Sequence, residues 1–81
     1  MEPVEINAGR WYLRALHAAE WAADTGYAWA VCEPTTGEPF AEVTADPASG
    51  EVSTQGDAEA ATAGAEAVRR FLLQLVAQPG Q

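Results

Sequence analysis

The sequence predicts an α+β fold, in which an antiparallel β-meander of three to four strands carries a long C-terminal helix on one face. Three observations predict this fold. One turn motif occurs twice, the segments that flank the turns alternate as strands do, and apolar residues near the C-terminus recur at helical spacing. The chain of 81 residues is long enough for a single domain, residues 1–81, with one modest core.

The repeated turn lies at Glu33–Glu38 and again at Asp46–Glu51. Both copies have an acid, a proline, two small or hydroxyl residues, a glycine and a glutamate, in that order. The proline sets φ for the first central position of a turn, and the glycine supplies the positive φ that closes a hairpin with a bulge. Two such turns predict three consecutive antiparallel strands, at 27–33, 39–45 and 51–55.

The first of these strands has large side chains on one face and small ones on the other. Because small residues let a helix approach closely, we expect the C-terminal helix on the face of Ala28 and Ala30. Tyr27, Trp29 and Phe40 then lie on the opposite face. They form either a core beneath the N-terminal segment or an exposed aromatic surface for a protein partner. The third strand is short and polar, as expected of a sheet edge.

The C-terminal helix is predicted over residues 57–78. Asp57 is a suitable N-cap, Glu59 in the first turn favours the helix dipole, and Pro79 with Gly80 ends the helix. The first half of its apolar stripe consists of alanine and glycine, which suits close packing on a sheet. The second half is rich in leucine and is apolar over more than one face.

The N-terminal third fits two structures. Residues 5–16 fit a strand, with Trp11 and Leu13 on one face. They also fit the start of a single helix that Asn7 caps and that runs to about Thr25. Periodicity alone leaves both interpretations open.

Composition limits the classes of function. Twelve acidic residues against four arginines and no lysine give a net charge of −8, which opposes binding to nucleic acid or to anionic membranes. No apolar stretch approaches the roughly 18 residues that span a bilayer, and no signal segment is recognisable, so we expect a cytoplasmic protein. The single cysteine excludes an internal disulfide.

Three segments, in this order, resemble the N-terminal half of a GNAT N-acetyltransferase of the bacterial kind. The segment "GRWYLRAL" is similar to the opening strand of that family, "YAWAVCEPTTGEPFAEVT" to its central hairpin, and "ATAGAEAVRRFL" to the start of its acetyl-coenzyme A helix. The resemblance covers most of residues 5–76. It implies a strand at 5–16 and then a short helix at 17–25, which Gly26 ends as its C′ residue.

The resemblance also implies a degenerate cofactor loop. In the family, an Arg or Gln and two small residues, mostly glycine, precede this helix, and backbone amides at the helix N-terminus hold the pyrophosphate. Here Glu59 stands in place of the Arg or Gln and Thr62 in place of the first glycine, which leaves Gly64 as the remaining cofactor-binding residue. The family's later strand, helix and general acid have no counterpart. We therefore expect no catalytic residue and no acetyl-coenzyme A cofactor.

Other chemically active side chains predict no site. His17 is the only histidine and is expected at the surface, and because a zinc site needs three or four ligands we expect no metal. Cys32, on a central strand, is expected to be a buried thiol. Glu66 is spaced to form ion pairs with Arg69 and Arg70 along the helix.

These observations leave three hypotheses of function. The leading one is a small non-catalytic GNAT-like domain that binds a protein partner or a second copy of itself, through the uncovered edge strand. The second is a residual binder of acetyl-coenzyme A or another acyl group, or an acetyltransferase that dimerisation completes. The third is an acidic regulator that binds a basic protein.

Overall fold

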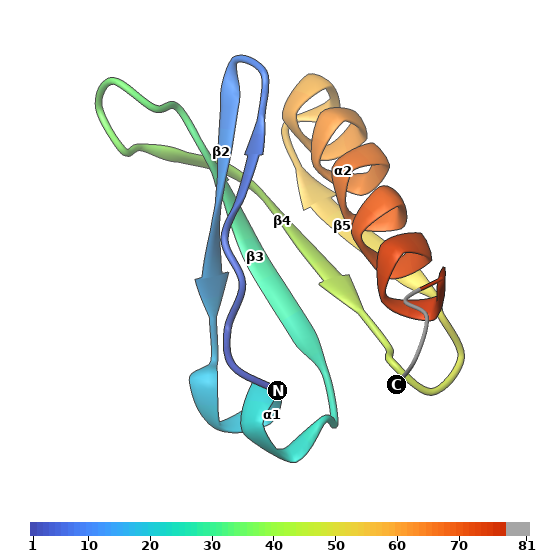
Figure 1. The fold of residues 1–81 in the computed structure, drawn as a ribbon. Coiled ribbons are helices and arrows are strands. Elements are labelled where there is room, and N and C mark those ends of the chain that lie inside the picture. The colour runs from blue at the N-terminus through green and yellow to red at the C-terminus, as the bar shows by residue number, and fades with distance from the viewer. Residues whose placement is uncertain (78–81) are drawn as a thin grey trace.

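The structure, a computed structural model, describes residues 1–77. It is an α+β fold, in which a short helix and a long C-terminal helix pack against a five-stranded antiparallel sheet. The strands follow one another in the sheet in the order β1 to β5, which is their order in the chain. Figure 1 shows the sheet and the two helices. The elements are β1 Ile6–Ala8, β2 Trp11–Leu16, α1 Ala18–Ala23, β3 Tyr27–Cys32, β4 Pro39–Ala45, β5 Val52–Gly56 and α2 Ala58–Ala77.

The N-terminal segment predicted as one strand over 5–16 is a hairpin. β1 and β2 pair antiparallel, with Asn7 opposite Tyr12 and Ala8 opposite Trp11. The chain reverses at Gly9, whose φ of 62° is a left-handed conformation that glycine adopts without steric cost. The prediction of three to four strands is therefore corrected to five, and the alternative of one helix from Asn7 to Thr25 is excluded.

The two matching turns are confirmed, and they have the same geometry. The amide of Gly37 donates to the carbonyl of Glu33, and the amide of Gly50 donates to the carbonyl of Asp46, each at 2.7 Å. The two glycines have φ of 75° and 77°. In each turn the carboxylate of the acid also accepts a hydrogen bond from the backbone N–H two residues further along the chain, at 2.6 Å in the first turn and 2.9 Å in the second. The shared motif therefore encodes one local structure twice.

The short helix α1 is confirmed, but a different residue ends it. Asp24, with φ of 58°, takes the left-handed position at the C-cap, and Gly26 does not. The Asp24 amide donates to the carbonyl of Trp21 at 3.1 Å, which satisfies one of the last carbonyls of the helix. Aspartate tolerates this conformation better than most residues because its short polar side chain can bond locally.

The long helix packs on the opposite face of the sheet from the one expected. α2 lies over the face that carries Val31 and Val43, and an added Cβ at Gly64 would meet their Cγ2 atoms at 2.7 Å and 2.8 Å. The small residues of α2, and not those of the sheet, allow this close contact. On the other face, Ala30 lies directly opposite Arg14 of β2 and Glu42 of β4. It is buried because the long side chains of these two neighbours cover it.

The start of α2 is as predicted. The Asp57 carboxylate accepts the amide of Ala60 at 3.0 Å, and the Asp57 carbonyl accepts the amide of Ala61 at 2.8 Å. Asp57 is therefore the N-cap. The predicted end of the helix at Gln78, before Pro79 and Gly80, lies outside the described residues.

Candidate functional site: the open edge of the sheet

The strand β5 forms one edge of the sheet and, within the described residues, pairs with β4 alone. Two backbone bonds of 2.9 Å fix the phase of this pairing, from Asp46 N–H to Glu51 O at one end and from Asp57 N–H to Phe40 O at the other. Alternate residues of an antiparallel strand bond to the same neighbour. The backbone groups of Ser53 and Gln55 therefore face β4, and the outward-facing residues are Val52, Thr54 and Gly56.

This edge has none of the features that usually protect an edge strand. Natural sheets block their edges with lysine, proline, bulges or covering segments. Residues 52–56 carry no charge and no proline, their ladder to β4 has no bulge, and four of the five residues are exposed. The row of outward N–H and C=O groups at Val52, Thr54 and Gly56 is thus open to a further strand.

A groove of about 470 Å³ runs between β5 and α2. Its lining is mixed: Val52 of the strand and Ala61 and Ala65 of the helix are apolar, and about as many lining residues are polar. Glu66 and Arg69 line the same groove from the exposed side of α2. The complete lining is Val52, Thr54, Gln55, Gly56, Ala58, Ala61, Thr62, Ala65, Glu66 and Arg69.

Glycine is required at the end of this groove. Gly56 has φ of 110°, and an added Cβ would lie 2.7 Å from both the Phe40 carbonyl oxygen and the Cα of Ala41. The close approach lets β5 end against β4 and turn directly into α2.

The ion pairs predicted along α2 are not formed. Within residues 1–77 the ion pairs join the Met1 amine to Asp24 and Arg10 to Glu59, at 3.3 Å and 2.9 Å. Glu66 takes part in neither, so the prediction that it pairs with the arginines of its own helix is wrong. Its carboxylate, like the guanidinium of Arg69, is exposed at the groove.

The aromatic surface predicted from Tyr27, Trp29 and Phe40 is not a surface in this fold. Trp29 is fully buried and Tyr27 is 5% exposed, because α1, α2 and the N-terminal segment cover them. The Trp21 ring stacks on Tyr27 at 4.5 Å and meets Trp29 edge-on at 5.0 Å, and Phe71 packs on all three. Both strand aromatics therefore belong to the core.

Phe40 does reach the surface, but on its own. It is 40% exposed, and its ring contacts Trp11 edge-on at 5.6 Å. The pairing of β3 with β4 has a register shift between Val31 and Cys32, next to Phe40. A single exposed aromatic residue is ordinary for a protein surface.

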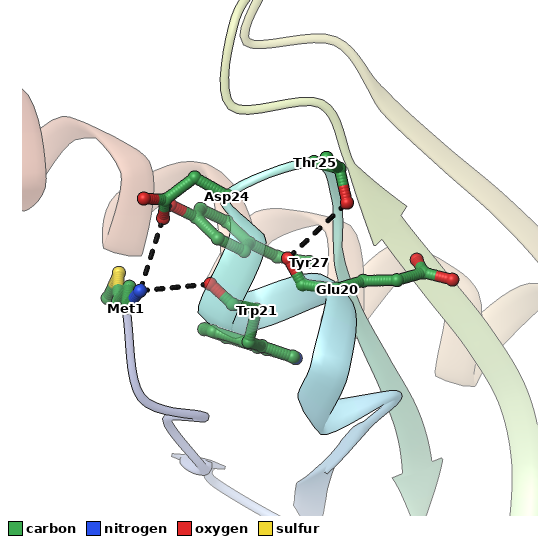
Figure 2. Close-up of polar contacts among 6 residues, drawn as sticks. All are labelled: Met1, Glu20, Trp21, Asp24, Thr25 and Tyr27. Carbon is green, nitrogen blue, oxygen red and sulfur yellow. Dashed lines mark hydrogen bonds and ion pairs between the residues drawn. The ribbon is translucent and has the colours of Figure 1, made fainter.

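The contacts around Tyr27 hold the N-terminal segment against α1 (Figure 2). The Met1 amine donates to the Trp21 carbonyl at 2.9 Å and to the Asp24 carboxylate at 3.3 Å, and the Tyr27 hydroxyl donates to the same carboxylate at 3.1 Å. Burial, followed by this hydrogen bond and the negative charge of Asp24, raises the pKa of Tyr27 above its ordinary value. A similar bond to Glu5 raises the pKa of Tyr12.

Gly64, the predicted remnant of a cofactor loop, lies inside α2. A diphosphate cradle uses amides that are free at a helix N-terminus, and those are confined to the first turn. Gly64 lies in the second turn and faces the sheet, in contact distance of Val31 and Val43. Gly64 is therefore a packing residue where α2 contacts the sheet. The start of the helix carries the carboxylates of Asp57 and Glu59.

The remaining chemically active residues lie apart from one another. His17 is exposed, and Cys32 is buried as predicted, 1% exposed, with its thiol against the Ala30 carbonyl at 3.5 Å. Over the described part of the chain, no three histidine, cysteine or carboxylate residues gather as metal ligands. Among the same residues, neither helix is long and apolar enough to cross a membrane.

Comparisons with models of protein families, with curated proteins and with solved structures find no match to this chain. The geometry of the edge therefore carries the functional interpretation. Sequence reasoning identified β5 as an edge strand but missed the groove, because the groove depends on the face that α2 covers.

Proposed function

We propose that this chain is a non-catalytic binding domain that adds a strand from a partner to its open edge, β5. The observation that carries the proposal is the uncharged edge strand Val52–Gly56 beside a groove that has both apolar and polar lining residues. In this mode of recognition the main-chain bonds of the added strand supply affinity, and alternate side chains supply specificity. The groove would take the side chains of the added strand that face α2.

The resemblance to the N-terminal half of a GNAT acetyltransferase supports this proposal in its element order. After β1, which the resemblance does not imply, the chain has strand β2, helix α1, the hairpin of β3 and β4, strand β5 and helix α2, in the order that the resemblance implies. The chemistry at the helix start supports a role without the cofactor. The Asp57 carboxylate already accepts the hydrogen bond of the Ala60 amide, and Glu59 adds a second carboxylate where a diphosphate would bind.

A peptide selection tests the proposal. A random peptide library is selected on the immobilised protein, and the selected peptides are titrated against the labelled protein by NMR. We expect extended peptides that shift the amides of Val52, Thr54 and Gly56. The matched control is Thr54→Pro, because the Thr54 amide faces outward and its loss leaves the bonds to β4 intact. Peptides that bind this variant equally well, or that shift other residues only, would contradict the proposal.

Calorimetry with acetyl-coenzyme A tests the non-catalytic part of the proposal. We expect no heat of binding at millimolar ligand, because the carboxylates of Asp57 and Glu59 repel a diphosphate at the start of α2. Binding in the micromolar range would instead favour a residual acyl-group binder.

A further inference from the structure

We propose that the strand added at β5 is the β5 of a second copy of this chain, paired antiparallel about a two-fold axis at Thr54. This inference rests on the proposed function, since it names the occupant of the same edge. Three properties of the edge lead to it: its register, the position of α2 and its charge.

The register of β5 is self-complementary. An antiparallel partner of the same sequence, centred on Thr54, places Val52 opposite Gly56 of the other copy and Gly56 opposite Val52. All three outward residues then form hydrogen-bonded pairs, about six backbone bonds in total, since each such pair exchanges two. Every outward group of the strand obtains a partner, and the two sheets join into one.

The position of α2 fits the same axis. Residues directly opposite in an antiparallel pair have their side chains on the same face, so both copies of α2 lie on one face of the joined sheet. α2 packs chiefly on β4 and β5. Two β5 strands about 4.8 Å apart therefore bring the two helices to about 10 Å, close to the distance at which helices pack. Each helix then fills the open side of the other copy's groove.

The charge of this surface also favours a second copy. The whole chain carries a net charge of −8, so two copies repel over most of their surface. The strand 52–56 is uncharged, and the groove has one carboxylate, Glu66, and one guanidinium, Arg69, whose formal charges cancel. A strongly acidic or basic partner finds no matching charge here. Because the two-fold axis runs the two helices in opposite directions, Glu66 and Arg69 follow one another in the reverse order on the facing helix. Neither negative nor positive charge therefore accumulates between the two helices.

The opposite edge of the sheet offers less for pairing than β5 does. β1 has only three residues, and a groove lies between it and α2. A strand of three residues offers fewer backbone groups for pairing than β5, so β5 is the better edge for extending the sheet. Pairing of β5 with β5 uses the same surface of both copies, so this contact closes at two copies.

Sedimentation with matched variants tests the proposal. We expect a dimer for the wild-type chain, and for Thr54→Pro and Thr54→Lys a dimer dissociation constant raised at least about tenfold, because both disturb the central pair. Ser53→Lys is the control, since its backbone faces β4 and its side chain the other face of the sheet. Circular dichroism must show the wild-type fold in each variant, and Thr54→Lys keeps the test decisive if Thr54→Pro unfolds.

Oxidative crosslinking fixes the register. In a Cys32→Ala background, Thr54→Cys places two thiols at the axis, with a Cα separation of about 5.5 Å that a disulfide spans. We expect a covalent dimer from this variant and none from Ser49→Cys, in the exposed turn before β5. A dimer that persists in both Thr54 variants, without the Thr54 crosslink, overturns the proposal.

The possible failures are distinguishable. A chain that stays monomeric at high concentration but binds selected peptides at Thr54 overturns self-pairing and leaves the binding function standing. A monomer that binds no such peptide overturns both.

Discussion

The two edge strands of the sheet, β1 and β5, differ in the protection that the rest of the chain gives them. Beside β1 the preceding segment is held in place, since the Trp29 indole N–H donates to the Val4 carbonyl at 2.7 Å and the Met1 amine is bound to α1. β5 has five residues against the three of β1, and most of them are exposed. In Figure 1 the N-terminal segment runs beside β2 towards α1, whereas β5 lies at the other side of the sheet with α2. Hydrogen bonds thus hold the segment that leads into β1, whereas β5, within the described residues, pairs with β4 alone.

The largest effect is expected from removing the packing that protects β1. Trp29→Ala should lower the free energy of unfolding by about 3–5 kcal/mol, because the indole is fully buried among aromatic rings. Urea denaturation measures the loss. Amide exchange at Ile6 and Ala8 should also accelerate, because the bond to Val4 is lost. In Trp29→Phe, which keeps a ring, the loss of stability should be clearly smaller, and equal losses would contradict this account.

The next largest effect is expected at the contact that seats α2 beside β5. Gly64→Ala should destabilise the fold by about 2 kcal/mol, although alanine is the better helix former, because its Cβ would meet Val31 and Val43 below 3.0 Å. Thermal or urea unfolding measures it. In a double-mutant cycle, Val43→Ala should make room for the added methyl group, so that the two changes together cost less than their sum. Strict additivity would show that the contact is not the cause.

The twin turns provide a matched pair of smaller effects. Gly37→Ala and Gly50→Ala should each cost about 1 kcal/mol, since both residues have left-handed φ and open space around the missing Cβ. Unfolding curves should give the same loss for both. Only Gly50 lies in the turn that leads into β5, so only its replacement should also weaken self-association. An equal effect of both on the dimer would contradict the assignment of β5 as the interface.

The smallest effect concerns pH. The raised pKa of Tyr27 means that the folded protein holds the phenol proton more tightly than the unfolded chain does. Its contribution to stability is complete below pH 10.0, the ordinary value, and is lost as the pH rises towards and through the folded pKa. Tyr27→Phe should therefore flatten the alkaline part of a stability profile measured in urea. A profile unchanged by the substitution would show that the Asp24 bond does not matter to folding.

The sequence predicted the parts of the fold that local chemistry determines. The turns at Gly37 and Gly50 and the cap at Asp57 depend on a few neighbouring residues, and all three were identified. The turn at Gly9 was missed because it lacks the proline and the acid of the other two turns. The hairpin of β1 and β2 was therefore predicted as a single strand.

Long-range arrangement was harder to predict. Alternation shows which residues share a face, but it does not show which face a helix covers. That is why the sequence left open whether Trp29 belongs to a core or to an exposed surface, and the structure shows that it is fully buried. The edge position of β5 followed from its short polar sequence, whereas the groove beside it could not be foreseen, because its walls come from two elements packed across the turn at Asp57.

Amide hydrogen exchange, measured by NMR at low and high protein concentration, tests the central claim most directly. The account predicts that Ser53 and Gln55, which bond to β4, are protected at both concentrations. Thr54, at the centre of the outer row, should exchange rapidly in the dilute sample and become protected in the concentrated one. Rapid exchange of Thr54 at every concentration, beside a protected Ser53, would contradict pairing of β5 with a second copy.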